Sequence, residues 1–256
     1  RSGRTSHDSF PGVIVHTEQT NESSGSAYGL HLGWSGNHHV RVEEQFTGRA
    51  YAQLGELFLP GEMLLEPGQA YKSPILYGAS TDKGLSALSG AFHRHVRAKL
   101  TDRRIANKIR PVHFNTWEAV YFDLSLERLC TLADHAREVG AERFVLDDGW
   151  FKNRKSDNAG LGDWAVDKTI FPAGLAPLIN HVHYNDMEFG LWVEPEMVNP
   201  DSDLYRAHPD WVLNTQPAPL LSARNQLVLD LTRVEVQDYL FERLDALLNE
   251  YPISYL

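Results

Sequence analysis

The sequence predicts a β-sandwich followed by an α/β barrel, and three observations support this fold class. From about residue 10 to residue 80, apolar residues recur with a period of two between frequent turn signals. After residue 110, apolar runs alternate with helical patterns, as in repeated βα units. Two adjacent carboxylates, Asp147 and Asp148, end one of these runs. In a barrel, functional side chains lie at such strand ends.

The first region is interpreted as antiparallel strands. Leu30, Leu32 and Trp34 alternate with His31 and Gly33. Turn signals separate the runs, at Pro11-Gly12, Ser35-Gly36-Asn37, Pro60-Gly61 and Pro67-Gly68. Val40 and Val42 repeat the alternation further along, so an antiparallel sandwich is expected here.

A helix is predicted next. Leu85, Leu88, Phe92 and Val96 are spaced by three, four and four residues, which makes one stripe of a helix ending near Leu100. The basic, polar residues 99–110 that follow are expected to form a linker.

The βα units begin at residue 111. A short apolar run over 111–114 predicts a strand ending in Asn115-Thr116-Trp117-Glu118. A helix is expected behind it and stops at Gly140. Its apolar face comprises Leu126, Leu129, Ala133, Ala136 and Val139.

Further units follow along the chain. The run 143–146 predicts a strand buried on both faces, and 189–193 predicts a third strand behind a helix over 175–182. Thr232 and Glu235 have the spacing of a capping box. The helix after it presents Leu240, Leu244, Leu247, Leu248 and Tyr251. Residues 253–256 begin another strand. Because no G-x-G-x-x-G follows the first strand, a barrel is favoured over a doubly wound sheet.

Composition excludes several classes of protein. The net charge of −10 argues against nucleic-acid binding, which needs a basic surface. The single cysteine, Cys130, excludes an internal disulfide framework and is expected in the core. The sequence contains no run of eighteen apolar residues, so no membrane span is predicted. One cysteine and an acidic isoelectric point favour a bacterial cytoplasmic location.

Four side chains fall at predicted carboxyl ends of strands: Trp117, Asp147, Asp148 and Trp192. A lone tryptophan there is commonly core packing, and a lone aspartate is commonly a helix cap. Adjacent carboxylates repel each other, so each needs a partner. Carboxylates accept hydroxyl hydrogen bonds and an indole covers the apolar face of a sugar ring, so a sugar site is predicted. Trp150, two residues after the doublet, offers a further indole.

Other candidates are less specific. Glu194 and Glu196 flank Pro195, and one of them is explained equally well by fixing the loop. Arg224 alone would be a surface arginine, but near acids its guanidinium holds a carboxylate or a sugar hydroxyl.

The sequence gives no support for catalysis by a metal, by a cofactor or by a serine or cysteine nucleophile. No cofactor is therefore expected. The pairs His93/His95 and His181/His183 lie in predicted helices, where residues two apart point in different directions. The first barrel strand offers His113 alone, and the members of His38-His39 face opposite sides of a strand. No G-x-S-x-G elbow occurs.

Several long motifs, in this order, resemble the bacterial and fungal α-galactosidases of glycoside hydrolase family thirty-six. They are residues 110–119 (RPVHFNTWEA), 145–151 (VLDDGWF), 162–164 (GDW), 189–205 (FGLWVEPEMVNPDSDLY) and 208–213 (HPDWVL), with Gly3–His7 resembling the family's sandwich. The resemblance implies that residues 1–80 are the C-terminal part of a β-supersandwich and 81–108 a helical linker. Residues 109–256 would be the first half of a (β/α)8 barrel, truncated near its fourth strand.

The resemblance also implies roles for the site. Asp147 and Asp148 would bind the O4 and O6 hydroxyls of a terminal α-galactosyl unit, Trp117 and Trp192 would line the pocket, and Arg224 would reach a hydroxyl or the nucleophilic carboxylate. The family's nucleophile lies in a Lys-Trp-Asp motif after a sequence like Ile253-Ser254-Tyr255-Leu256. That motif and the acid/base aspartate do not occur here, so this chain is expected to be an inactive internal fragment with no catalytic residue.

The expected activity of the parent is retaining hydrolysis of α-galactosides, a class of small carbohydrate, in a homo-oligomer that binds neither nucleic acid nor membrane. Two alternatives within enzymes are an α-N-acetylgalactosaminidase and a galactosyl transferase of the raffinose-synthase type. An alternative of another class is a non-catalytic galactose-binding barrel. The residues after Leu256 would discriminate, because Lys-Trp-Asp means an enzyme. Half a barrel leaves an open strand edge, so the fragment alone is expected to aggregate.

Overall fold

The computed structural model describes residues 4–214, 220 and 222–256. Gly3, the first residue of the Gly3–His7 segment, lies outside this range. The chain divides into two compact units, Arg1–Lys108 and Ile109–Leu256. Within the described residues, no helix is both long and apolar enough to cross a membrane.

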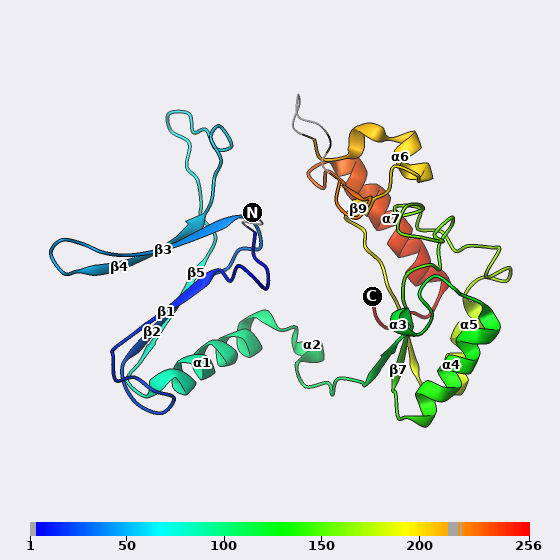
Figure 1. The fold of residues 1–256 in the computed structure, drawn as a ribbon, viewed down its shortest axis with the longest axis horizontal. Helices are drawn as coiled ribbons and strands as arrows, with labels where there is room; N and C mark the ends of the chain where they lie inside the picture. The colour runs from blue at the N-terminus through cyan, green and yellow to red at the C-terminus, as the bar shows by residue number, and fades with distance from the viewer. Residues whose placement is uncertain (1–3, 215–219, 221) are drawn as a thin grey trace. The chain divides into compact units, whose positions relative to one another are not determined.

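The first unit consists of antiparallel strands and a helix (Figure 1). Its elements are β1 (Gly12–His16), β2 (Ala27–Leu32), β3 (His38–Glu44), β4 (Ala50–Glu56), β5 (Leu76–Thr81), α1 (Gly84–His95), the π-helical turn η1 (Val96–Leu100) and α2 (Arg103–Ala106). One sheet has the order β1-β2-β5, and β3 and β4 form a second, two-stranded sheet. All of these pairs are antiparallel, as the period-two pattern predicts.

Helix α1 packs against β2 and β5. Leu88 is fully buried. Phe92 lies so close to Gly29 that a Cβ on residue 29 would be 2.7 Å from the Phe92 ring, so this position of β2 favours glycine. The predicted helix over 85–100 is confirmed, with η1 as its last turn. The residues expected to form the linker contain the end of η1 and the short helix α2. Asp102 begins α2 by accepting a hydrogen bond from the Arg104 N–H at 2.8 Å.

The second unit contains a parallel sheet flanked by helices. Its elements are β6 (His113–Asn115), α3 (Trp117–Val120), α4 (Leu126–Glu138), β7 (Arg143–Leu146), α5 (Ala176–Tyr184), β8 (Glu188–Leu191), β9 (Met197–Val198), α6 (Asp203–Ala207), the 3₁₀ turn η2 (Pro209–Trp211), β10 (Leu227–Val228) and α7 (Val234–Glu250). The sheet order is β6-β7-β8, and all pairs are parallel. Tyr255 bridges in parallel to Gly190, so the predicted last strand joins the far side of β8.

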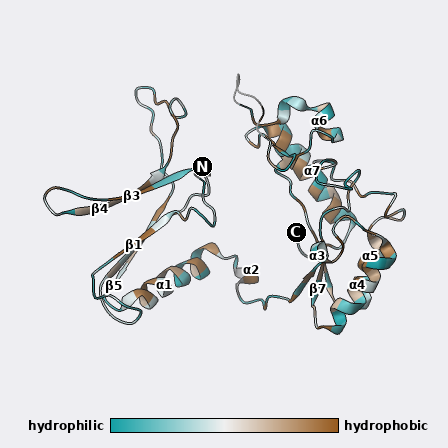
Figure 2. Cartoon of the chain, viewed as in Figure 1, coloured by the Kyte–Doolittle hydropathy of each residue, from teal (hydrophilic) through white to brown (hydrophobic). Residues whose placement is uncertain are grey.

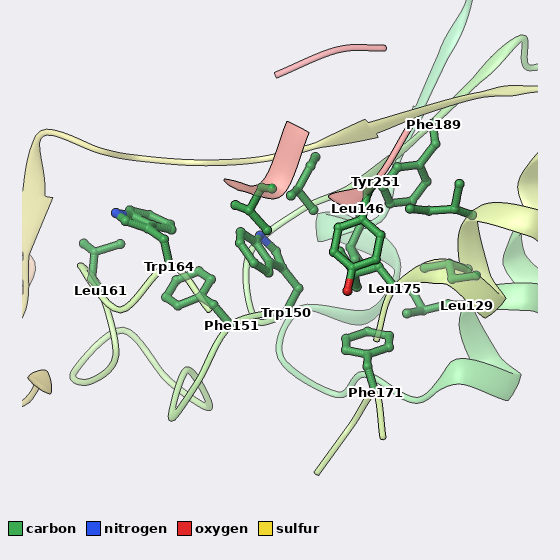
Figure 3. Close-up of a cluster of buried hydrophobic side chains, with 14 of the residues drawn as sticks. Leu129, Leu146, Trp150, Phe151, Leu161, Trp164, Phe171, Leu175, Phe189 and Tyr251 are labelled. Atoms are coloured by element: carbon green, nitrogen blue, oxygen red, sulfur yellow. The ribbon is translucent and has the colours of Figure 1, made fainter. Parts of the chain in front are cut away.

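The core of this unit lies around β7, whose four residues are all buried, as predicted for a parallel strand. Trp150, Phe151 and Trp164 pack together here, with ring centroids 4.7–6.3 Å apart (Figure 3). Trp150 has no exposed surface, and its Nε1 donates to the Trp192 carbonyl at 2.9 Å. This indole is therefore a core residue and is closed to a sugar.

Hydrophobic and hydrophilic residues alternate along α4 and α7 (Figure 2). Leu129, Ala133 and Ala136 are buried as predicted, but Val139 is 81% exposed because it follows the last residue of α4 and leaves the helical stripe. On α7, Leu240 and Leu247 are buried, whereas Leu248 is 45% exposed because it points about 100° away from Leu247.

The predicted capping box at the start of α7 is wrong. Arg233 occupies the N-cap position and makes no side-chain cap. The Thr232 hydroxyl instead donates to Asp230 at 2.6 Å, because that carboxylate closes a turn just before the helix. Spacing alone does not distinguish the two arrangements.

The amino ends of the parallel strands hold an ionic cluster. His113, Arg143 and Glu188 are register partners at the first positions of β6, β7 and β8. The Arg143 guanidinium donates to Glu188 at 2.9 Å from Nε, lies 3.1 Å from the His113 ring nitrogen and lies over the Tyr255 ring. His113 therefore belongs to the amino-terminal edge of the sheet, opposite the edge where barrels carry their chemistry.

Candidate functional site

The carboxyl ends of β6, β7 and β8 meet at one edge of the sheet. Asn115 pairs with Val145, and Val145 pairs with Gly190. Backbone bonds continue past the strand ends, since the Thr116 N–H donates to Val145 at 3.1 Å and the Trp192 N–H to Leu146 at 2.9 Å. The side chains that follow each strand are therefore presented along one edge, as expected for parallel strands.

Asp147 is half-buried and held between two strand ends. The Asn115 side-chain amide donates to Asp147 Oδ2 at 2.6 Å, and the Asp147 N–H donates to the Thr116 hydroxyl at 3.0 Å. Its other oxygen accepts the Asp148 N–H at 2.7 Å. These bonds fix the carboxylate while leaving part of it exposed. Asp147 can therefore accept a hydroxyl hydrogen from a ligand.

Asp148 is 5% exposed and forms a bidentate ion pair with Arg154. Arg154 Nε donates to Oδ1 at 2.8 Å and Nη2 donates to Oδ2 at 2.7 Å. The Gly149 N–H adds a third bond at 2.7 Å. The two neighbouring carboxylates thus have different partners, an amide for Asp147 and a guanidinium for Asp148. These partners offset the repulsion between the two negative charges.

The two predicted indoles are half-buried and come from the ends of β6 and β8. The Trp117 ring packs edge-to-face against Tyr121 and Phe122, with centroids 5.1 Å away in both cases. Trp192 lies edge-to-face with Trp164 at 6.4 Å. Each ring is supported from one side by another aromatic ring and keeps some exposed surface, which is the arrangement that a sugar-stacking residue needs.

Arg224 lies beside Asp157, an acid outside the doublet. Its side chain is 65% exposed, and Nη2 is 3.7 Å from Asp157 Oδ1. Asp157 Oδ1 is in turn 3.8 Å from Arg154 Nη2, so Arg224 connects to Asp148 only through a chain of charges among the described residues. The structure brings Arg224 to the same loop cluster and gives it no direct bond to either carboxylate of the doublet.

The sequence model of the melibiase family matches residues 70–256. The chain belongs to the melibiase family. Residues 1–66 match the glycosyl hydrolase family 36 N-terminal domain.

The relatives that this chain matches include α-galactosidases. It is 46% identical to the α-galactosidase of Escherichia coli, over 100% of this chain and 36% of that protein. The crystal structure of α-galactosidase AgaB from Geobacillus stearothermophilus superposes with a TM-score of 0.93 at 40% identity, covering 100% of this chain and 35% of that one. A variant of AgaA from the same organism, solved in complex with stachyose, gives a TM-score of 0.92 at 38% identity over 100% and 36%.

The chain thus spans about a third of the length of the relatives that it matches. Its fold matches about a third of these α-galactosidase structures, which have an N-terminal sandwich domain and a barrel domain. The resemblance to glycoside hydrolase family 36 is confirmed.

Three residues of the candidate site were not predicted from the sequence. Arg154 lies in a polar stretch that predicts an exposed loop, and no pattern in the sequence indicates its burial. Asn199 is fully buried and bonds Arg154 and Asn225, which lie on two other loops. Asn115 carried a usable signal, because it directly ends the strand next to the acidic doublet.

Glu194, which sequence reasoning left ambiguous, is a half-buried acid at the end of β8. Burial raises the pKa of its carboxyl, and the nearby Glu196 raises it further, while Arg224 opposes the shift. Gln226 donates to it at 3.3 Å. Glu194 therefore belongs to the electrostatic surroundings of the doublet.

The remaining candidates lie away from this edge. His93 and His95 lie in α1 and His181 and His183 in α5, as predicted. Among the described residues, no group of three or more metal-ligating side chains gathers. Cys130 is half-buried against the core, and burial raises the pKa of its thiol, which disfavours the reactive thiolate.

Proposed function

We propose that the complete gene product containing this chain is an α-galactosidase that hydrolyses terminal α-galactosyl units with retention. The observation that carries the proposal is the acidic doublet, which lies at the carboxyl end of β7. All 256 residues of this chain match part of an α-galactosidase. Paired acceptors beside half-buried indoles suit a sugar better than any other small ligand class.

Each site residue receives a role in this proposal. Asp147 and Asp148 accept the O4 and O6 hydroxyls of the galactosyl unit, and Trp117 and Trp192 line the pocket. Arg224 reaches a sugar hydroxyl or the nucleophilic carboxylate. An acid placed for the axial O4 of galactose loses its partner in the glucose epimer, which gives specificity.

We assign no catalytic residue to this chain. A retaining glycosidase needs two carboxyls about 5–5.5 Å apart, one as nucleophile and one as acid/base. The Lys-Trp-Asp motif of the family's nucleophile does not occur in residues 1–256. In this proposal, residues 1–80 are part of the supersandwich, 81–108 a linker, and 109–256 the first half of the barrel, reaching its fourth strand. The binding wall lies here and the covalent chemistry lies elsewhere in the gene product.

The proposed substrates are small α-galactosides. Variants of the relative AgaA have been solved in complex with stachyose and with raffinose, which supports oligosaccharides of this class. We also propose a homo-oligomer, and a cytoplasmic location on the grounds of one cysteine and an acidic isoelectric point.

The test uses the complete gene product and an aryl α-galactoside. Proton NMR of the first-formed sugar should show the α anomer, which means retention; a β-anomer as first product would refute the mechanism. Asp147→Asn should lower kcat/KM about 10- to 150-fold, because a hydrogen bond to a charged acceptor is replaced by a neutral one.

Asp186→Asn is the matched control, since the side chain of Asp186 is 86% exposed and lies outside the site. It should leave kcat/KM unchanged. Equal activity of the Asp147→Asn variant and this control would remove Asp147 from the sugar site.

A further inference from the structure

The guanidinium of Arg154 is buried at the centre of a network of hydrogen bonds. Its side chain has no exposed surface. Nε and Nη2 donate to Asp148, while Nη1 donates to Asn199 Oδ1 at 3.0 Å and to the Ala159 carbonyl at 3.1 Å. Burying a charge is costly unless it is paired and its donors are satisfied. Here the geometry meets both conditions, so the guanidinium has one stable orientation.

That orientation fixes Asp148. A carboxylate has about four lone-pair positions, of which Arg154 occupies two and the Gly149 N–H a third. About one acceptor position is therefore left for a ligand, in a direction set by Arg154. Phe122 and Phe151 lie 5.5 and 5.7 Å from the guanidinium carbon and restrict its movement further.

Asn199 extends the same network to Arg224. It has no exposed surface, and its Oδ1 accepts from Arg154 and from the Leu161 N–H at 2.9 Å. Its Nδ2 donates to the Asp157 carbonyl at 3.0 Å and to the Asn225 carbonyl at 2.8 Å. Asn225 and Arg224 have φ of 60° and 52°, in the left-handed region, which is uncommon for an arginine and which the hydrogen bond from Asn199 to Asn225 helps to hold.

We propose that Arg154 and Asn199 are positioning residues for sugar recognition: Arg154 aims the free acceptor of Asp148 at one galactosyl hydroxyl, and Asn199 holds the turn that presents Arg224. The proposal rests on the proposed α-galactosidase function. It assigns the network a role beyond stability, because the same two buried side chains support residues on two separate loops of the pocket.

The first experiment removes the hydroxyl as well as the arginine. Steady-state kinetics of the complete gene product are measured with p-nitrophenyl α-galactoside and its 4-deoxy and 6-deoxy analogues, for the wild type and Arg154→Lys. Lysine keeps the charge and loses the bidentate fork. We expect a loss of about 100-fold in kcat/KM on the parent substrate, as for a small misplacement of a binding group.

On the analogue that lacks the hydroxyl bound by Asp148, Arg154→Lys should lower kcat/KM by no more than about twofold. On the other analogue the full loss should remain. Equal losses on all three substrates would mean that Arg154 acts only on stability and would overturn its assignment. Arg206→Lys is the control, since Arg206 pairs with Asp201 and Asp203 on the surface and should change none of the values.

The second experiment tests Asn199 and does not depend on whether Arg154→Lys folds. Asn199→Asp keeps the acceptor toward Arg154 and loses the donors toward Asp157 and Asn225. We expect about a tenfold loss in kcat/KM, because the turn that presents Arg224 loses its hydrogen bond from Asn199. When Arg224→Ala is already present, adding Asn199→Asp should lower kcat/KM by no more than about twofold. An undiminished loss in that background would overturn the assignment of Asn199.

The two levels of the proposal fail separately. A wild-type gene product without activity on the parent α-galactoside would contradict the proposed function itself. A wild type that hydrolyses this substrate with retention, together with substrate-independent losses in the Arg154 variant, would contradict only the positioning role.

Discussion

At the scale of residues, acids near the strand ends occupy different electrostatic environments. Asp147 is held by the Asn115 amide and Asp148 by the Arg154 guanidinium. Among the described residues, the side chain of Glu194 has no cationic hydrogen-bond partner. It lies near Glu196 and Asp148, which are also acids. The pKa of the Glu194 carboxyl is raised, because burial disfavours its charged form.

The pH dependence of stability follows from this shift. The ordinary pKa of glutamate is 4.5, and that of Glu194 in the folded chain is higher. In the pH window between the two values the folded state binds more protons than the unfolded state, so stability falls as pH rises through it. Glu194→Gln removes this loss. The free energy of unfolding of the complete gene product should therefore decrease less between about pH 4 and about pH 7 in the variant.

Urea unfolding at the two pH values measures this difference. Glu242→Gln, an exposed substitution on α7, serves as the control and should follow the wild type. A wild-type slope in the Glu194→Gln variant would show that Glu194 is ionised normally in the folded state.

At the scale of elements, Gly162-Asp163-Trp164 shows how a motif that carries the resemblance can be structural. Gly162 has φ of +106°, and a Cβ there would lie 3.0 Å from Val198 and 3.1 Å from Leu204, so a larger residue would be strained. Trp164 packs in the core. Asp163 accepts the N–H groups of Asp203 at 2.8 Å and Leu204 at 2.9 Å, so it caps α6 from a distant loop.

Removing this cap should destabilise the fold. Asp163→Ala leaves two N–H groups at the start of α6 without their acceptor, and should lower the free energy of unfolding by about 1–3 kcal/mol. Asp163→Asn keeps one acceptor oxygen and should lose less. Urea unfolding of the complete gene product measures both, with the exposed Asp238→Ala as control. Equal stability of Asp163→Ala and the control would show that Ser202, which accepts the Tyr205 N–H, caps α6 alone.

At the scale of the whole molecule, each unit leaves large apolar side chains uncovered within the described residues. Phe10, Ile14 and Tyr28 are 56–68% exposed in the first unit, and Phe241 is 69% exposed on α7. Val42 on β3 is 52% exposed, although its alternation is that of a sandwich strand. Patches of this kind mark surfaces that bind other parts of a protein or cause aggregation.

The 256-residue chain produced alone should therefore bind the dye ANS, form aggregates in size-exclusion chromatography and show no turnover of aryl α-galactosides. The complete gene product, measured in parallel, should be monodisperse and active. A monodisperse, active 256-residue chain would contradict both the exposed surfaces and the assignment of the catalytic carboxylates to other segments.

The sequence by itself determined the elements and the edge where the candidate site lies. Local periodicity and turn residues specify strands and helices, so β7, α1 and α4 were predictable, and so was the position of Asp147, Asp148, Trp117 and Trp192 at strand ends. Only the tertiary structure decided which of these side chains are buried and what holds them. Trp150 became core, Thr232 did not cap α7, and Arg154 became the partner of Asp148, because pairing and burial depend on the path of loops that no local pattern specifies.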